Sequence, residues 1–181
     1  MRLRQVSRIW HKCKKLLGDE LLKAIIAQLI APETTPSARA EFFAGLPDLS
    51  AKHEIIYKND VYQQGFRAHI ISPEQMVCSL PVAGNSQYYG VFNGGSTALL
   101  GETTGSIAAN LMAREGTMAV GIDINVQHLL PAYEGRVYCL ATLLHKGRIV
   151  RYRLDFYRAD GEQSAVGTHS CTFVSRISRP N

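Results

Sequence analysis

The sequence predicts an α+β fold in which a curved antiparallel sheet wraps around one long central helix, preceded by an N-terminal helical extension. Three observations support this prediction. Amphipathic helical spacing fills the first 50 residues, small and apolar residues dominate 96–111, and β-rich runs separated by glycine turns follow. Helices and strands that are segregated along the chain are typical of α+β folds. We therefore expect a helical extension over residues 1–50 and one α+β domain over residues 51–181.

The extension is predicted to be helical because apolar residues recur every three or four positions from Val6 to Ile30. Gly18 followed by Asp19 indicates a break between two short helices. After a turn-rich stretch, Ala38–Leu46 is expected to form another helix. Nothing in the extension carries recognisable chemistry.

Strands and the central helix follow the extension. Alternating β-branched and aromatic residues predict strands at 55–62, 66–71 and 76–82. Residues 96–111 are small or apolar on nearly every side, which predicts a buried helix. Glycines inside a helix cost about 1 kcal/mol each relative to alanine, so we expect a surrounding sheet to approach this helix closely.

The C-terminal part of the chain is predicted to be entirely β-structure. Its apolar, β-rich runs lie at 118–126, 135–145, 149–158 and 164–175. Gly147 and Gly161 lie between the last three runs, where we expect them to supply the positive φ of tight turns. The last three strands should therefore form an antiparallel meander.

Composition narrows the class of protein. The chain has 181 residues, 46% of them hydrophobic, which suffices for one well-filled core. Its four cysteines form no Cys-x-x-Cys pair, so we expect reduced thiols in a cytoplasmic protein, with neither a zinc knuckle nor a disulfide scaffold. The longest apolar run, Leu21 to Ala31, is shorter than the roughly 20 residues of a membrane-spanning helix. No small-residue cleavage site follows the basic start, which argues against secretion.

The net charge of +5 comes from one segment. Residues 1–15 hold six basic side chains and no acid, whereas residues 16–181 hold 14 basic and 15 acidic side chains. We interpret the basic segment as a solvated helix face, with contact to an anionic membrane or nucleic acid as the alternative. A nucleic-acid partner is not expected for the nearly neutral remainder.

The most unusual residues surround the start of the predicted central helix. A Gly-x-x-Asn-Gly-Gly turn at 90–95 is followed by Glu102, which lies seven residues after the second glycine, and then by Ser106. Asn-x-x-His-x-x-Pro follows at 125–131, and the turns at 144–148 and 160–161 add two further motifs.

With these motifs in this order, residues 76–174 resemble the hotdog-fold acyl-CoA thioesterases, particularly those of the phenylacetate-degradation (PaaI) type. The resemblance implies a hotdog fold, hydrolysis of acyl-CoA or related thioesters, and no cofactor beyond the CoA moiety of the substrate. The site residues that it implies are Gln87, Asn93, Gly94, Gly95, Glu102, Ser106 and His128.

Two features qualify the resemblance. Many of these enzymes have histidine where this chain has Asn93, and an asparagine can donate through its amide but cannot become a cation or shuttle a proton. Of the five histidines other than His128, three match no motif and His145 flanks a turn, and we assign none of the five a role. Among these is His169, which is expected on a strand.

The chemistry of the motif residues suits thioester hydrolysis, which needs donors for the carbonyl oxygen and a carboxylate that attacks or activates water. Gly94 and Gly95 at a helix start are expected to leave backbone N–H groups free for an oxyanion. Glu102 and Ser106 share one helix face, so the serine could position a water or restrain the acid. A lone carboxylate on an apolar helix should have a raised pKa, as a general base often does.

Each of these features also has a plainer interpretation. A glycine pair before a helix is usually a turn, a helical serine is usually a packing residue, and a histidine at a strand end usually lies in a loop. Their joint order is what favours a site. Tyr88, Tyr89 and Phe92 could line an aromatic or medium-chain acyl pocket or could belong to the core.

The spacing along the central helix predicts a site made by two chains. Glu102 lies about 10 Å beyond Gly95 at 1.5 Å per helical residue, whereas reacting groups must come within about 3 Å. Antiparallel helices from two subunits would bring the groups together in a homodimer. The resemblance implies edge-to-edge pairing of the sheets, and further pairing into tetramers.

The CoA phosphates are expected to meet Lys146, Arg148 or Arg151, near a predicted turn. Two other functions remain open. One is a non-catalytic acyl-CoA-binding regulator whose basic N-terminal helix contacts nucleic acid or membrane. The other is a hotdog hydratase or dehydratase, which would need an Asp–His pair at a spacing that the chain lacks.

Overall fold

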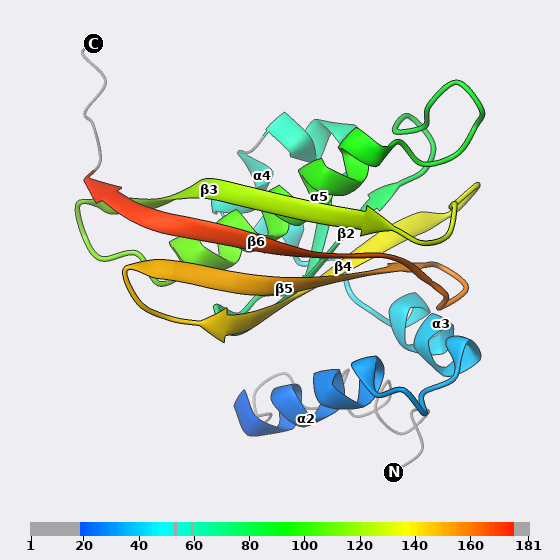
Figure 1. Ribbon diagram of the computed structural model, residues 1–181, viewed down its shortest axis with the longest axis horizontal. Helices are drawn as coiled ribbons and strands as arrows, with labels where there is room; N and C mark the ends of the chain where they lie inside the picture. Colours follow the sequence, from blue (N-terminus) through cyan, green and yellow to red (C-terminus); the bar gives the residue numbers. More distant parts are fainter. Residues whose placement is uncertain (1–18, 53, 59, 176–181) are drawn as a thin grey trace.

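The structure, a computed structural model, describes residues 19–52, 54–58 and 60–175 and has the expected α+β architecture (Figure 1). The central helix α5, Gly94–Asn110, packs against one face of a six-stranded antiparallel sheet. Helices α2, Asp19–Ile30, and α3, Pro36–Ala44, pack against the opposite face. The basic segment at 1–15 and the helix expected over 6–17 lie outside the described residues.

The sheet has the strand order β1-β2-β4-β5-β6-β3, and every neighbouring pair is antiparallel. The strands are β1 Arg67–Ile70, β2 Gln75–Pro81, β3 Thr117–His128, β4 Arg136–His145, β5 Ile149–Arg158 and β6 Gln163–Ser175. The predicted meander β4-β5-β6 is confirmed. Strand β3 precedes it in the sequence but pairs with β6, so β3 forms one edge of the sheet.

The turns of the meander differ from each other. Gly161, between β5 and β6, has a φ of +84°, as predicted. Gly147, between β4 and β5, does not have a positive φ, so the prediction for this turn is wrong. The short loop connects β4 to β5 without a positive φ at this glycine. A β-bulge lies beside the loop, between Leu143 and His145.

The middle of the sheet is buried on both faces. Along β4, Val137, Cys139 and Ala141 belong to the core under α5, whereas Tyr138 and Leu140 belong to the core under α2 and α3. Successive side chains of a strand point to opposite faces, so a strand covered on both sides is apolar at consecutive positions. The helical extension thus encloses a second core.

Helix α3 is fixed to the sheet by aromatic contacts. The Phe43 ring stacks on the Tyr138 ring at a centroid distance of 4.4 Å and an interplanar angle of 11°. The Arg39 guanidinium lies 5.2 Å from the centroid of the Tyr157 ring and also donates to the carbonyl of Gly161. These contacts hold the extension against the end of the meander.

The strand predicted at 55–62 is wrong. Residues Glu54–Tyr57 form the short helix α4, and 3₁₀ turns occupy Ser50–Lys52 and Asp60–Gln64. Glu54 and Lys58 form an ion pair at the i,i+4 spacing of a helix. Short apolar runs fit helix and strand patterns equally well, so the local pattern did not distinguish them.

The central helix approaches the sheet closely at its glycines, as predicted. A Cβ atom on Gly101 would lie 2.8 Å from Cδ1 of Leu154, and one on Gly105 would lie 2.3 Å from Nδ1 of His169. Any side chain at these positions would displace the helix or its neighbours. The glycines therefore set the distance between α5 and the sheet.

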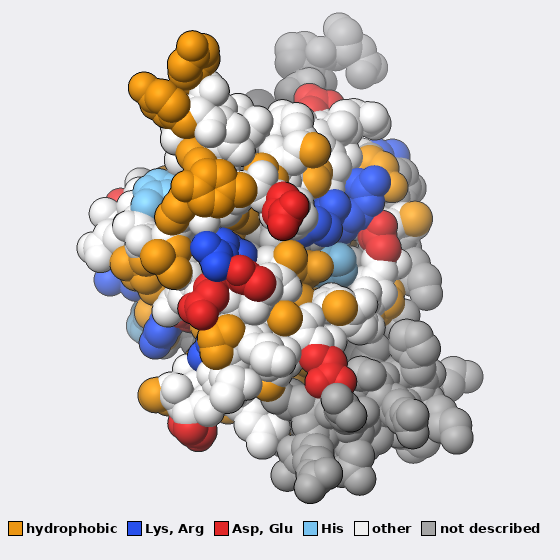
Figure 2. Space-filling model, turned by 90° about the vertical axis from the view of Figure 1, so that its right-hand side faces the viewer, with side chains coloured by type: hydrophobic (Ala, Val, Ile, Leu, Met, Phe, Trp, Pro, Cys, Tyr) orange, Lys and Arg blue, Asp and Glu red, His pale blue; other side chains and the backbone are white. Residues whose placement is uncertain are grey.

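The loop before α5 carries exposed aromatic residues. The side chains of Tyr88 and Tyr89 are 96% and 80% exposed, and their rings meet edge to face at 5.3 Å. Figure 2 views the molecule from the side of this loop, where hydrophobic side chains project from the surface. In the single chain these two tyrosines belong neither to the core nor to a pocket wall, whereas Phe92 is buried. Over the described ranges, no helix is long and apolar enough to cross a membrane.

The substitution Phe43→Ala is expected to lower the free energy of unfolding by about 3–5 kcal/mol, because it removes a buried ring and leaves a cavity against Tyr138. Urea denaturation followed by circular dichroism measures the loss. Tyr89→Ala, which removes an exposed ring, is the control and should change stability by less than about 0.5 kcal/mol. Equal stability of the two variants would show that the extension does not stabilise the sheet.

Candidate active site

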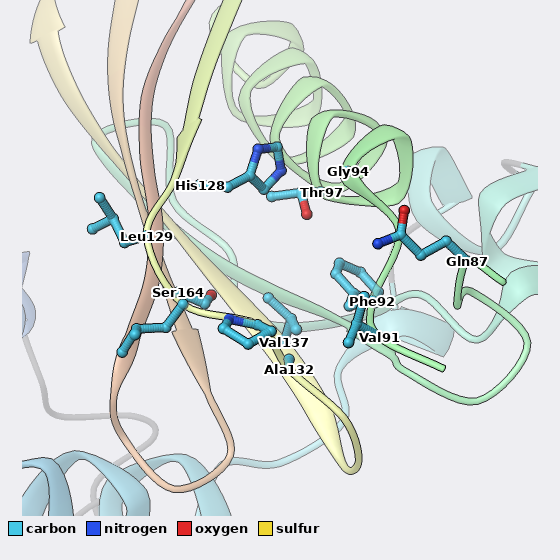
Figure 3. Close-up of a pocket in the computed structure, with 12 residues that line it drawn as sticks. Gln87, Val91, Phe92, Gly94, Thr97, His128, Leu129, Ala132, Val137 and Ser164 are labelled. Atoms are coloured by element: carbon cyan, nitrogen blue, oxygen red, sulfur yellow. The ribbon is translucent and has the colours of Figure 1, made fainter. Parts of the chain in front are cut away.

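A cavity of about 370 Å³ opens at the start of α5 (Figure 3). Its walls are mostly apolar and come from the loop before α5, the first turn of the helix and the segment after β3. The lining residues are Gln87, Val91, Phe92, Gly94, Thr97, His128, Leu129, Leu130, Pro131, Ala132, Val137 and Ser164. Ser164 is buried, and its hydroxyl has no hydrogen-bond partner among the described residues, so it is available to a polar group of a bound ligand. Three predicted site residues, Gln87, Gly94 and His128, therefore share one cavity.

Asn93 caps the helix. Its backbone is extended, and its Oδ1 accepts a hydrogen bond of 2.7 Å from the N–H of Gly95. The N–H of Gly95 is therefore engaged, and the prediction that it is free for an oxyanion is wrong. The N–H of Gly94 and the Nδ2 group of Asn93 have no hydrogen-bond partner in the part of the chain that the structure describes. These two donors are available at the cavity end of the helix.

His128 ends β3 beside this helix start. A Cβ atom on Gly94 would lie 3.3 Å from Cε1 and 3.4 Å from Nε2 of the His128 ring, so any side chain there would press on the ring. In Figure 3 the ring lies next to Thr97 and Gly94, and Gln87 faces the same space from the opposite side. The helix start thus presents amide donors beside an imidazole and a carboxamide.

Glu102 lies two turns further along α5 and does not line this cavity. Its Oε2 lies 2.7 Å from Nε2 of His169, and its Oε1 accepts a hydrogen bond of 3.0 Å from the Ser106 hydroxyl. The side chain is 38% exposed. It lies over Gly121 of β3, where a Cβ atom would approach Oε1 to 2.2 Å. The predicted pairing of Glu102 with Ser106 is confirmed, and both carboxylate oxygens have a partner.

The expected raised pKa of Glu102 is wrong. The hydrogen bond from His169 lowers the pKa of Glu102 below its usual value, and this effect outweighs the desolvation that would raise it. The carboxylate is therefore ionised at neutral pH. The group that lowers this pKa comes from β6 and not from the helix, so the residues near Glu102 in the sequence do not reveal it.

His169 is the site residue that sequence reasoning missed. It is fully buried on β6, 67 positions beyond Glu102. Neither its spacing nor a motif marks it. The one local signal was Gly105, because a glycine inside a helix implies that something bulky packs against it.

Asn110 fixes the helix in register with β3. Its Nδ2 donates to the carbonyl of Ala119, and its Oδ1 accepts from the N–H of the same residue. Nδ2 also donates to the carbonyl of Ser106. This two-way contact ties the end of α5 to the Ala119 backbone of β3 and holds Glu102 across from Gly121.

The residues predicted for CoA do not reach the cavity within one chain. Lys146 and Arg148 are exposed in the β4–β5 turn, about 30 Å along β4 from the cavity residue Val137. Arg151 is exposed and donates to the Ser170 hydroxyl. Its neighbour Tyr152 faces the core under α5, so Arg151 points to the opposite face of the sheet.

No metal centre is visible in the described ranges: they contain no group of three or more His, Cys, Asp or Glu side chains placed to hold an ion. The site groups that the structure does bring together are amide donors and a hydroxyl at the helix start and an imidazole–carboxylate pair two turns away.

Comparisons with known proteins agree with this arrangement. The family model described as Thioesterase superfamily matches residues 89–165. A Haemophilus influenzae protein named "Putative esterase" is 33% identical over 90 residues, which cover 49% of this chain and 65% of that protein. A Deinococcus radiodurans protein of the same name is 29% identical over 113 residues, which cover 61% of this chain and 71% of the relative.

Solved structures give the same result. A thioesterase from Haemophilus influenzae matches with a TM-score of 0.61 and 28% identity, over 67% of this chain and 86% of the other. A mutant thioesterase from Pseudomonas aeruginosa matches with a TM-score of 0.65 and 27% identity, over 72% of this chain and 96% of the other. The chain therefore has the hotdog fold, and residues 89–165, which include the helix start, Glu102 and His128, are similar to the thioesterase superfamily.

Proposed function

We propose that this protein hydrolyses acyl-CoA or related acyl thioesters by a mechanism that depends on Glu102. The observation that carries the proposal is the ionised, partly exposed Glu102 carboxylate on a buried helix, inside the segment that matches the thioesterase superfamily. Burial of a charge is costly unless the charge is paired, so a paired carboxylate that remains open to solvent is a strong candidate for chemistry.

The groups at the helix start supply the complementary half of the reaction. As a nucleophile or water attacks the thioester carbonyl, negative charge develops on the carbonyl oxygen. The N–H of Gly94 and the Nδ2 group of Asn93 are unengaged donors at this helix start among the described residues, and the N-terminal end of the helix dipole favours the same charge. Glu102 either attacks the carbonyl carbon directly or removes a proton from the attacking water.

Two chains are needed to complete the site. Glu102 lies eight residues beyond Gly94, about 12 Å along the helix, and does not line the cavity of its own chain. Strand β3 pairs with β6 on one side and forms an edge of 12 residues, with Ile122 51% exposed. Such an edge suits pairing with another strand. Pairing of two β3 edges about a two-fold axis would give a homodimer in which the Glu102 of one chain serves the cavity of the other.

The cavity supports an apolar acyl group, aryl or medium-chain, because Phe92, Leu129 and Val137 contribute to its walls. In the two-chain arrangement, the Glu102 end of one subunit meets the helix start of the other. The exposed Lys146 and Arg148 then become candidates for the CoA phosphates. Arg151 is a weaker candidate because it lies on the sheet face away from α5.

The substitution Glu102→Gln is expected to reduce thioester hydrolysis by about 10²–10⁴-fold, because the amide can neither attack nor take a proton. Hydrolysis of a panel of aryl- and acyl-CoA thioesters, followed by release of the free thiol, measures the loss. Glu115→Gln, at an exposed position beyond α5, is the matched control and should retain full activity. Wild-type turnover in folded Glu102→Gln protein would remove Glu102 from the mechanism.

Glu102→Gln and Gly94→Val, each nearly inactive alone, are expected to recover about a quarter of the wild-type activity when the two chains are co-folded. The valine side chain in place of Gly94 would crowd the His128 ring and the thioester carbonyl. Random pairing makes about half of the dimers mixed, and each mixed dimer has one intact site of two. Mixed dimers isolated through two different affinity tags should therefore show about half of the wild-type activity per dimer. If they are as inactive as the parents, a single chain supplies the whole site.

A further inference from the structure

We propose that His169 is a positioning residue whose buried imidazole fixes the orientation and the charge state of the Glu102 carboxylate. This inference rests on the proposed thioester hydrolysis. It concerns a residue that does not line the cavity and that acts through Glu102.

The contact is specific in its geometry. Nε2 of His169 and Oε2 of Glu102 are 2.7 Å apart, and the ionised carboxylate can only accept, so Nε2 carries the proton. The other carboxylate oxygen accepts from Ser106, so the two partners fix the carboxylate plane between them. Glu102 thus has a defined orientation although more than a third of its side chain is exposed.

The backbone makes room for this pair on both elements. Gly105 on α5 faces the His169 ring, and a Cβ atom there would lie 2.3 Å from Nδ1. Gly121 on β3 faces Glu102, and a Cβ atom there would lie 2.2 Å from Oε1. Because a helical glycine reduces stability, the glycine at 105 indicates that the space for the imidazole is a specific requirement of the site.

The surroundings of His169 contain one acid among the described residues. From its own strand, the Cys171 thiol lies 3.7 Å from Nδ1. From β5, Tyr152 is its cross-strand neighbour, and the Tyr152 hydroxyl donates to the carbonyl of Pro73. On β3, the residue paired with His169 is the apolar Ile124. Glu102 is therefore the carboxylate that acts on the charge of His169, together with the Cys171 thiol.

This environment makes the pair ionic at neutral pH. Burial disfavours the imidazolium, but the contacts with Cys171 and Glu102 outweigh it and raise the pKa of His169 to about 9. The same contact lowers the pKa of Glu102. A cation behind the carboxylate keeps Glu102 ionised when an apolar acyl group displaces water from its other side. Without that cation, a carboxylate in the filled site would take up a proton more easily.

The principal test is the pH profile of kcat for His169→Gln. Glutamine keeps a donor near Glu102 but cannot carry charge, so the acid limb of the profile should move upward by about one to three pH units. At neutral pH, kcat should fall by about 10- to 100-fold with little change in KM, as expected for a misplaced catalytic group. His145→Gln, at an exposed position near the β4–β5 turn, is the control and should leave the profile unchanged.

A second pair of variants tests the same point without changing His169. Gly105→Ala pushes on the imidazole and should shift the acid limb in the same direction. Gly101→Ala crowds Leu154 and Phe156 instead, so it should reduce stability without moving the profile. These variants keep the proposal testable if His169→Gln does not fold.

The outcomes separate the inference from the proposed function. If wild-type protein hydrolyses thioesters, Glu102→Gln is inactive, and both His169→Gln and Gly105→Ala keep the wild-type acid limb, the inference is wrong and the function stands. If wild-type protein hydrolyses no thioester of the panel, the function fails and the inference fails with it. An upward shift in His169→Gln and Gly105→Ala, absent in both controls, supports the inference.

The ion pair should also appear in the pH dependence of stability. Because the pKa of His169 is raised, its contribution is complete below pH 6.5 and is lost as the pH rises through about 9. Because the pKa of Glu102 is lowered, its contribution is present above pH 4.5 and is lost as the pH falls through the lowered value. The difference in unfolding free energy between wild type and His169→Gln should therefore shrink between pH 7 and pH 10. A constant difference over that interval would contradict an ionic pair.

Discussion

The close approach of α5 to the sheet is the constraint on which the rest of this structure depends. Gly101 and Gly105 remove the side chains that would hold the helix away, and the sheet side chains of Leu154, Phe156 and His169 fill the space. Two interior glycines cost the helix about 2 kcal/mol relative to alanine. This cost is offset by the burial of Leu100 and Ile107 against the sheet. The same close approach lets Glu102 contact His169 of β6 while part of the Glu102 side chain stays exposed to solvent.

The second core, under α2 and α3, affects how the chain can assemble. These helices cover the apolar part of the outer sheet face, where Val77, Tyr138 and Leu140 lie. The register places Gln75, Thr142, Arg153, Thr168 and Asn125 in one row across five strands, on that same outer face. Pairing of subunits through the outer face would have to bury this polar row. Pairing through the β3 edge does not cover this face of the sheet.

The elements that could be predicted from the sequence are those whose pattern is local. The small and apolar composition of the buried helix and the β-rich runs of the four strands after it are local signals, and the structure confirms these elements within a few residues. The strand prediction for 55–62 was wrong because eight residues fit both a helical and a strand periodicity, and contacts such as the Glu54–Lys58 pair favour the helix.

The role of His169 could not be predicted for a different reason. Its partner lies 67 positions away, and only the fold reveals that β6 passes beneath Glu102.

The position of His169 explains how the site can work with Asn93 where many of the similar enzymes have a histidine. The resemblance placed a histidine before the two glycines, and a mechanism that needs a cation there cannot operate in this chain. The asparagine instead uses its carbonyl oxygen to cap Gly95, which leaves its NH₂ group and the Gly94 N–H as neutral donors. The imidazolium lies behind the carboxylate, at His169, where it neutralises the resting charge of Glu102. During the reaction, negative charge moves away from Glu102, and so away from the imidazolium, to the carbonyl oxygen. The helix dipole and the two neutral donors must therefore stabilise the negative charge on that oxygen. The proposed mechanism therefore predicts a site in which His169 governs the ionisation of Glu102 and the helix start stabilises the transition state.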